Sequence, residues 1–352
     1  MRELLRSAER RGETDARAFL ERPEALHGTL LANFGAGGAG EAALRRALHA
    51  LHAPPGILGA TCRLVGERRA RCARAVFERY AYWHGARRRL EVDTWRRLTR
   101  GTVVLMYHAF GRPGEPASRF VVPARRFERQ LRRLARRRRP VLRLEELVDC
   151  RRQGRLAPAG AVVITMDDGY ADNRELAAPL LRRFGFSATV FAVSDRIGGA
   201  ADWDGAGELS GRPLLDLDGL LGLQESRIAV GAHSRTHPRL PELDAKAVSE
   251  EVGGSREELT ERIGAPVVCF SYPYGRVSDD AVAAVARAGF GCACGIRRGL
   301  NYPDTPLLEL RRVPVDGDAS MLRFALGVRF GDPDLVTRTL AHLRRVVLGG
   351  SA

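Results

Sequence analysis

Two carboxylates and two imidazoles in this sequence have the types and spacing that metal-assisted hydrolysis requires. Asp167 and Asp168 follow the apolar run 161–166 (AVVITM), which we expect to form a buried strand. The carboxyl ends of parallel strands form the active-site face of an α/β protein. Neighbouring side chains in an extended chain point to opposite sides, so one carboxylate can hold a metal while the other acts as a base. Taken alone, an Asp-Gly pair is as typical of an ordinary turn.

The second pair is His233 and His237, which follow the short apolar run 228–231. If the segment between them turns helically, both rings can converge on one ion, and neutral imidazole suits zinc and related divalent metals. A lone histidine is more often structural. One aspartate with two histidines, each after an expected strand, is a three-ligand set that leaves positions open for water and substrate.

These residues carry a resemblance to a known family. Thr165–Gly169 (TMDDG) resembles the first motif, T-F-D-D-G, of the polysaccharide deacetylase (NodB-homology) family, carbohydrate esterase family 4, and His233–His237 (HSRTH) resembles its second, H-S/T-x-x-H. The resemblance covers residues 101–316. It implies that Asp167 is the general base and that Asp168, His233 and His237 bind the metal.

The sequence departs from the family pattern in two places. Ser271 stands where the family commonly has an arginine that orients the catalytic aspartate, and Arg311 or Arg312 from a late strand is the candidate replacement. The late L-x-I-H motif, whose histidine acts as general acid, is absent from the sequence. His108, after the run 104–107 (VLMY), is our candidate acid; the alternative is a strand-end histidine with a structural hydrogen bond.

Strands and helices are expected to alternate from residue 101 onward, which implies an incomplete parallel barrel. The resemblance implies the same fold, a distorted (β/α)7 barrel, here with an α-helical N-terminal extension. We expect an extension at 1–100, a catalytic barrel at 101–320 and a C-terminal helical segment packing on the barrel at 321–352. The expected strands are 102–107, 161–166, 187–193, 228–232, 266–270, 289–295 and 307–315. The expected helices are 41–53, 67–89, 124–139, 144–152, 173–184, 213–225, 244–263, 278–288 and 332–348.

The chain is strongly basic, with a net charge of +15 that arginine carries almost entirely. Within the arginine-rich run 125–139, Phe127, Leu131 and Leu134 form an apolar stripe, so the arginines are expected on a solvated outer face and nucleic-acid binding is not favoured. In the N-terminal extension, Leu44, Ala47, Leu48 and Leu51 form one expected apolar face, and Cys72, Val76, Tyr80 and Trp83 form another. Packing against the rest of the protein is the favoured interpretation, and peripheral contact with an anionic membrane is the alternative.

Cysteine use and hydropathy bear on the compartment. The six cysteines are scattered and read as buried thiols, with Cys292 and Cys294 expected to point to opposite faces of a strand. Residues 1–23 show no apolar core of a signal peptide, and no apolar stretch is long enough to span a membrane. We therefore expect a protein of the cytoplasm or of the cytoplasmic membrane face. The resemblance leaves an extracytoplasmic location open.

The expected reaction removes an N-acetyl (or O-acetyl) group from an amino sugar, glycan or lipid-linked sugar. Zinc is the favoured single divalent ion, with Co, Ni, Mn or Fe as alternatives. The turn Pro273–Tyr274 is expected to stabilise the oxyanion through the Tyr274 N–H, and Trp203 to stack on a sugar ring. The alternatives are a deformylase or other amide hydrolase on a non-sugar substrate, and a catalytically silent carbohydrate-binding module.

Overall fold

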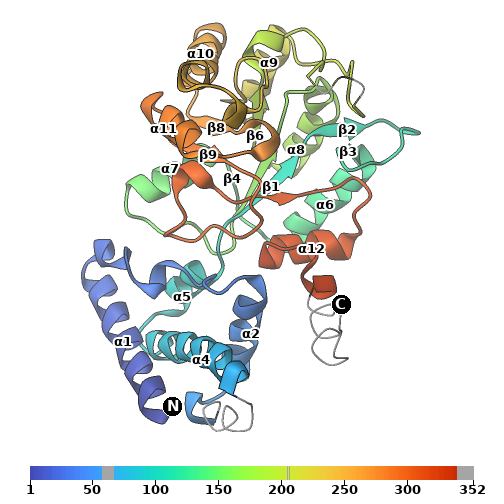
Figure 1. Ribbon diagram of the computed structural model, residues 1–352. Coiled ribbons are helices and arrows are strands. Elements are labelled where there is room, and N and C mark those ends of the chain that lie inside the picture. Colours follow the sequence, from blue (N-terminus) through green and yellow to red (C-terminus); the bar gives the residue numbers. More distant parts are fainter. Residues whose placement is uncertain (58–66, 204, 206, 339–352) are drawn as a thin grey trace.

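A parallel sheet that curls into a distorted barrel dominates the computed structural model, which describes residues 1–57, 67–203, 205 and 207–338 (Figure 1). The strands run in the order β10-β1-β5-β6-β7-β8-β9, and β4 pairs beside β5. Their bounds are β1 Val103–Tyr107, β4 Val141–Leu142, β5 Val162–Met166, β6 Ala188–Ala192, β7 Ile228–Ala232, β8 Cys269–Ser271, β9 Cys292–Cys294 and β10 Val313–Pro314. A separate parallel pair joins β2 (Ala109–Gly111) to β3 (Val121–Pro123). The expected fold class, a distorted (β/α) barrel with N-terminal helices, is confirmed.

The barrel closes between β9 and β10 through very few contacts. Leu310 forms a single-residue parallel bridge with Cys294, and three residues later Val313 pairs with Leu105 of β1. The expected long strand 307–315 is therefore wrong in extent, since Leu307–Glu309 is a 3-10 turn. Pro314 has no N–H to donate to a ladder, which fits the brevity of β10.

Alternation along the strands separates an inner from an outer core. Val104 and Val163 lie in one buried cluster, while Val103 and Leu105 lie in another with residues of the surrounding helices, because successive side chains leave a strand on opposite sides. The inner cluster also contains Phe191, Cys269, Cys292, Cys294 and Leu310, with Leu144, Leu147 and Val148 of α7 (Leu144–Arg152). Cys292 and Cys294 thus share a face and the expectation of opposite faces is wrong, since residues i and i+2 of a strand point the same way.

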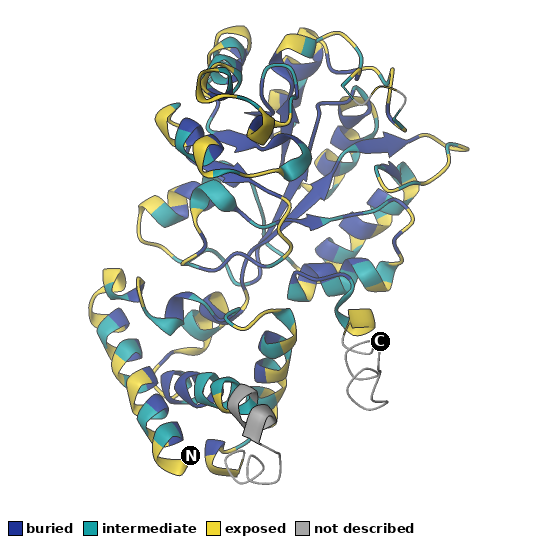
Figure 2. Cartoon of the chain, viewed as in Figure 1, coloured by how far each residue is buried: buried dark blue, intermediate teal, exposed yellow. Residues whose placement is uncertain are grey.

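Helices cover the outside of the barrel and expose only their outer faces (Figure 2). They are α6 Ala124–Arg136, α8 Ala178–Phe184 with a preceding π-helical turn Asn173–Ala177, α9 Leu217–Glu225, α10 Ala245–Ile263 and α11 Asp279–Arg287. The helix expected from residue 213 begins at Leu217 because the Asp216 side chain accepts the N–H of Gly219 as its cap. On α6, Phe127, Leu131 and Leu134 are buried as expected.

The N-terminal helices gather at one end of the barrel, beside α12 (Figure 1). They are α1 Arg2–Glu21, α2 Ala39–Ala50, α4 Glu67–Arg87 and α5 Val92–Thr99; α12 spans Met321–Phe330. α1 and α4 approach closely at two glycines: a Cβ on Gly12 would lie 1.9 Å from the carbonyl oxygen of Tyr82, and one on Gly85 would lie 2.0 Å from that of Glu9. Any larger side chain at either glycine would force the helices apart.

Of the two apolar faces expected in the N-terminal extension, the one on α4 is buried at two of its residues and the one on α2 is not buried. The face expected on α2 is wrong, because Leu44 and Leu51 are 46% and 76% exposed while Ala42 and Arg45 are buried. Arg45 is held by the Phe34 carbonyl oxygen and by Glu41, so a buried ion pair takes the place of an apolar stripe. On α4, Tyr80 and Trp83 are buried and Val76 is partly buried, in agreement with packing, while the side chain of Cys72 lies outside what the structure describes.

Two further expectations concern membranes and the C-terminal helix. Among the described residues, no helix combines the length and the apolar character needed to cross a membrane. Most of the helix expected at 332–348 lies outside the described residues. Of the part that the structure describes, residues 335–338 are helical.

Candidate active site

Asp168, His233 and His237 converge at the carboxyl ends of β5 and β7. Oδ1 of Asp168 lies 3.3 Å from Nε2 of His233 and 3.4 Å from Nε2 of His237. Their ligand atoms all lie within 4.8 Å of one another, and all three residues are buried. The structure thus brings the three expected ligands together. Two ring nitrogens and one carboxylate oxygen lie close to a common point, which is the arrangement that a divalent cation needs.

Strained backbone, and not a helical turn, makes the two imidazoles converge. Ser234 and His237 have left-handed φ angles of 62° and 64°, and the Ser234 Oγ accepts the His237 N–H at 3.0 Å. Asp168 and Tyr274 are left-handed as well, with φ of 71° and 55°. The two histidines therefore converge as expected, but without the helical turn that we considered as the means. Left-handed residues other than glycine cost about 1–3 kcal/mol each and concentrate at functional sites.

A carboxylate from α10 holds the loop between the histidines. Oε2 of Glu251 accepts the backbone N–H groups of Arg235 and Thr236 at 2.9 and 3.0 Å, and Oε1 accepts the Thr236 hydroxyl at 2.7 Å. Two helical turns further on, Glu258 accepts from Arg235 at 2.7 Å and from the Ser194 hydroxyl at 2.5 Å. These contacts fix the loop that carries both imidazoles.

The His233 ring is oriented by the backbone of β8. Its Nδ1–H donates to the Ser271 carbonyl oxygen at 2.7 Å, which leaves Nε2 to face Asp168. Burial lowers the pKa of His233, but its hydrogen bond to Asp168 and the charges of Asp167 and Asp168 outweigh burial and raise it. Burial raises the pKa of Asp168, yet the hydrogen bonds from His233 and His237 hold it well below its usual range. A donor set that attracts a proton this strongly also fits a divalent cation at the same point.

Asp167 forms a buried ion pair beside this set. Its Oδ1 accepts from Nη1 of Arg312 at 2.6 Å, and its Oδ2 lies 3.5 Å from the Ser271 hydroxyl. Arg312 is fully buried and also donates from Nε to the Gly295 carbonyl oxygen at 2.8 Å. Burial raises the pKa of Asp167, but Arg312, with smaller contributions from His233 and His108, holds it below its usual value.

Of the two candidate arginines, the structure brings only Arg312 to Asp167. Arg311 points elsewhere, with its side chain over Gly299 and its backbone paired with Asn301. Adjacent residues of an extended segment face opposite sides, so only one of the pair can enter the barrel.

His108 lies at the end of β1, half-buried, with its ring 5.1 Å from that of Phe120. It is close enough to Asp167 and Asp168 for its charge to lower the pKa of both. Its backbone is fixed because Asn173 donates to its carbonyl oxygen at 2.9 Å. The structure therefore places the candidate acid at the same end of the barrel as the metal ligands.

Two aromatic rings, those of Trp203 and Tyr274, flank His237 in the site. The centroid of the Trp203 ring lies 4.5 Å from the centroid of the His237 ring. The centroid of the Tyr274 ring lies 4.7 Å from the same His237 centroid. Pro273 is buried and begins the 3-10 turn Pro273–Gly275 that carries Tyr274. The Tyr274 hydroxyl reaches the Trp203 carbonyl oxygen at 3.5 Å, so the two loops are joined next to the expected ligands.

Sequence reasoning missed Glu251, Glu258 and the carbonyl of Ser271. Glu251 and Glu258 are seven residues apart on one helix, so they share a face, and this spacing is a usable signal for paired acidic anchors. The Ser271 contact uses a backbone oxygen, for which no side-chain motif exists.

The fold and the site together define the class of NodB-type (β/α) barrels, and the comparisons with known proteins agree. Residues 155–293 match the family model described as polysaccharide deacetylase. YxkH of Bacillus subtilis (strain 168), which carries the name of a polysaccharide deacetylase, is 24% identical over 212 residues, or 60% of this chain and 70% of YxkH. The expected resemblance to the polysaccharide deacetylase family is confirmed, and residues 155–293 are the segment that carries it.

Solved structures share the fold at low identity. The deacetylase PplD of Streptococcus pyogenes, solved with acetate, aligns at a TM-score of 0.54 and 20% identity, covering 68% of this chain and 97% of PplD. IcaB from Ammonifex degensii aligns at a TM-score of 0.56 and 22% identity, covering 66% of this chain and 97% of IcaB. The N-terminal helices lie outside the matched family segment.

Proposed function

We propose that this chain is a metal-dependent hydrolase that removes an acetyl group from an N-acetylated (or O-acetylated) amino sugar or glycan. The observation that carries the proposal is the juxtaposition of a three-ligand set, Asp168, His233 and His237, with a separate buried carboxylate, Asp167, that an arginine holds ionised. Amide hydrolysis needs both an electrophile to activate the carbonyl and a base to activate water.

Asp168, His233 and His237 would hold the ion, which we expect to be zinc, with Co, Ni, Mn or Fe as alternatives. A divalent ion in such a site polarises the acyl carbonyl and lowers the pKa of water. The Ser271 carbonyl and Glu251 hold the ligand rings in position, so the protein meets the ion with little rearrangement.

Asp167 is the proposed general base. Arg312 occupies Oδ1, which leaves Oδ2, 3.5 Å from the Ser271 hydroxyl, as the oxygen that takes a proton from the attacking water. As the C–N bond breaks, His108 protonates the departing nitrogen, and acetate and a free amine are the products. The backbone N–H of Tyr274, in the turn beside His237, is the proposed donor to the oxyanion.

A sugar substrate suits the aromatic side of the site. The rings of Trp203 and Tyr274 flank His237, and aromatic rings beside a polar site are suited to contact with the apolar face of a pyranose. The names of the relatives support the acyl group, since PplD is called a deacetylase and was solved with acetate. A lipid-linked acetylated amino sugar is a further candidate substrate.

The test is acetate release from N-acetylated chitooligosaccharides, O-acetylated glycans and formylated analogues, using full-length protein stripped by chelator and reloaded with Zn, Co or Ni. We expect acetate release that needs the metal and that Asp167→Asn abolishes, while Asp218→Asn, at an exposed aspartate on α9, behaves as wild type. Formate release without acetate release would instead establish a deformylase. Stoichiometric metal binding without turnover on any substrate would establish a binding module and overturn the proposal.

A further inference from the structure

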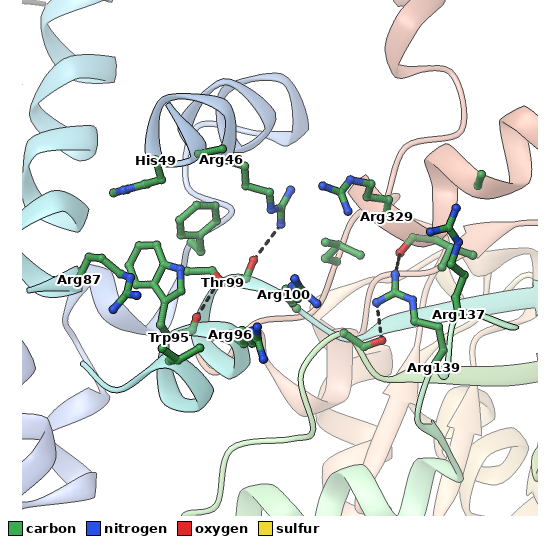
Figure 3. A pocket seen from close by; sticks show the side chains of 18 of the residues that line it. Arg46, His49, Arg87, Trp95, Arg96, Thr99, Arg100, Arg137, Arg139 and Arg329 are labelled. Atoms are coloured by element: carbon green, nitrogen blue, oxygen red, sulfur yellow. Dashed lines mark hydrogen bonds between the residues drawn. The ribbon is translucent and has the colours of Figure 1, made fainter. Parts of the chain in front are cut away.

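A cavity of about 1000 Å³ lies between the N-terminal helices and the barrel (Figure 3). Its wall includes Gly101 and Gly160, which come just before β1 and β5. The cavity is therefore at the amino ends of the strands, whereas Asp168 and His233 are at the carboxyl ends. It is separate from the proposed catalytic site, and the mechanism above makes no use of it.

The lining of this cavity is strongly cationic. Nine arginines line it, and among the described residues no aspartate or glutamate does. Three histidines line it too, but burial, with the neighbouring cations, lowers the pKa of His49 to about 3, so the positive charge comes from the arginines. Five of these residues, which we call the arginine cluster, surround the space from different elements: Arg46 on α2, Arg100 after α5, Arg137 and Arg139 after α6, and Arg329 on α12. Figure 3 shows their guanidinium groups gathered around one space.

No carboxylate neutralises the arginine cluster within the described part of the chain. None of its five members forms an ion pair there, whereas Arg88 at the edge of the cavity pairs with Glu13 at 3.4 Å. Burial, with the charges of Arg100, Arg329 and Arg46, lowers the pKa of Arg139 to about 10. Burial is the larger cause of this shift and the neighbouring charges are the smaller one, and an anion bound between the guanidinium groups would counter both.

Backbone carbonyl groups hold two members of the cluster, Arg139 and Arg46, in place. Arg139 donates to the carbonyl oxygens of Gly160 at 2.8 Å and of Val328 at 3.1 Å. Arg46 donates to the Thr99 carbonyl oxygen at 2.9 Å. These contacts orient two guanidinium groups at opposite sides of the cavity in advance of any ligand, which reduces the entropy cost of binding.

We infer that this cavity binds a small molecule that bears a diphosphate group. Arginine pairs with phosphate oxygens through two parallel hydrogen bonds, and two linked phosphates offer enough charge and enough oxygens to engage several arginines at once. The volume exceeds that of a lone phosphate and is in the range of small-molecule sites. Walls contributed by separate helices suit a compact ligand better than a flat membrane or a nucleic-acid duplex.

The group attached to the diphosphate could contact either of two walls of the cavity. The wall that it contacts would distinguish a nucleoside diphosphate from a prenyl diphosphate. Tyr80 and Trp95 form an aromatic wall that would suit a nucleoside, while Leu134, Phe324 and Val328 form an apolar wall that would suit a prenyl chain. In either case the phosphates would join the N-terminal helices, through Arg46 and Arg100, to the barrel, through Arg139 and Arg329. Binding should therefore stabilise the whole chain.

The test uses full-length protein with inorganic pyrophosphate, ADP and geranyl diphosphate, followed by titration calorimetry and by thermal unfolding against NaCl of matched ionic strength. We expect saturable binding of one diphosphate per chain and a rise in Tm that NaCl does not reproduce. A preference for ADP over pyrophosphate would identify a nucleotide, and a preference for geranyl diphosphate would identify a prenyl compound.

The variant is Arg100→Gln/Arg329→Gln, since both side chains are exposed and neither forms an ion pair within the described residues. We expect it to lose about tenfold in affinity for each arginine removed. Its Tm without ligand should equal or exceed that of wild type, because repulsion is relieved. Arg125→Gln, on the outer face of α6, is the matched control and should bind as wild type.

Three results would overturn the inference. They are the absence of saturable diphosphate binding at millimolar concentration, wild-type affinity in the double variant, and tighter binding of duplex DNA or of anionic vesicles than of any diphosphate. The inference does not depend on the proposed deacetylase activity, so each can fail without the other.

Discussion

Replacing Arg312 with glutamine tests how the protein substitutes for the motif arginine that is absent at Ser271. Glutamine keeps a hydrogen-bond donor but removes the charge that faces Asp167. In the native protein Arg312 and Asp167 are 2.6 Å apart, with side-chain exposures of only 0% and 4%. Solvent therefore cannot compensate for the lost guanidinium.

The expected effects on stability follow from that burial. Removing one partner of a buried pair costs about 3–5 kcal/mol, and because glutamine still donates we expect about 3 kcal/mol of lost unfolding free energy at pH 7. The depressed pKa of Asp167 stabilises the native fold above the usual value of 3.8, and this contribution is lost as pH falls through the lower folded value. In the variant burial raises that pKa, so the deficit relative to wild type should shrink as pH falls toward 4.

We expect Arg312→Gln to lower kcat/KM and to shift its pH profile. A base that is no longer oriented should cost roughly 100-fold in kcat/KM. Because Asp167 must be ionised to accept a proton, its raised pKa should move the acid limb of the kcat/KM profile to higher pH. Arg312→Lys should restore part of both, since it restores the charge without the second hydrogen bond to Gly295.

The assay is a pH profile of acetate release together with urea unfolding at pH 4 and pH 7. Arg311→Gln is the matched control, because this neighbouring arginine does not contact Asp167, and it should keep wild-type activity. If Arg312→Gln and Arg311→Gln showed the same profile, the orienting role assigned to Arg312 would be refuted.

Three further predictions concern the groups around the metal ligands. Glu251→Ala should weaken metal binding roughly 10–100-fold in a competition titration, because two loop N–H groups lose their acceptor. Glu257→Ala, at an exposed glutamate of the same helix, should leave the affinity unchanged. Unchanged affinity in Glu251→Ala would mean that the loop keeps its conformation without this carboxylate. His108→Gln should lower kcat about 10²–10⁴-fold with metal content intact, and wild-type kcat would move the acid elsewhere. Ser271→Ala should change kcat/KM by less than about threefold, because a carbonyl holds His233; a large loss would assign a role to the hydroxyl.

The sequence was sufficient to predict that Asp168, His233 and His237 cluster, because strand ends are local features that a parallel barrel brings together. Asp168 and His233 each follow a short apolar run. Side chains two residues apart on a strand face the same side, so Asp167 faces inward like Val163, and His233 lies on the same side of its strand as Gly231. The choice between Arg311 and Arg312 could not be made, because it depends on the register of a strand only two residues long. Contacts with Glu251 are long-range and have no local signature.

The N-terminal helices show a different limit of sequence reasoning. On α1 the buried residues Leu5, Ala8, Gly12, Ala16 and Phe19 follow helical spacing, yet three of them are alanine or glycine and give little apolar signal. On α2 the large apolar residue Leu44 faces solvent, and Ala42 shares the inner face with a buried ion pair, Arg45 with Glu41. Periodicity identifies a buried face only when apolar residues form it.

The most direct test of the central claim compares bound metal with turnover in two single variants, by elemental analysis and acetate release on the same preparations. The account predicts that His237→Ala loses metal and activity together, whereas Asp167→Asn keeps wild-type metal content and loses most turnover. Wild-type activity in His237→Ala without bound metal, or wild-type turnover in Asp167→Asn, would contradict the assignment of separate metal and base roles to this site.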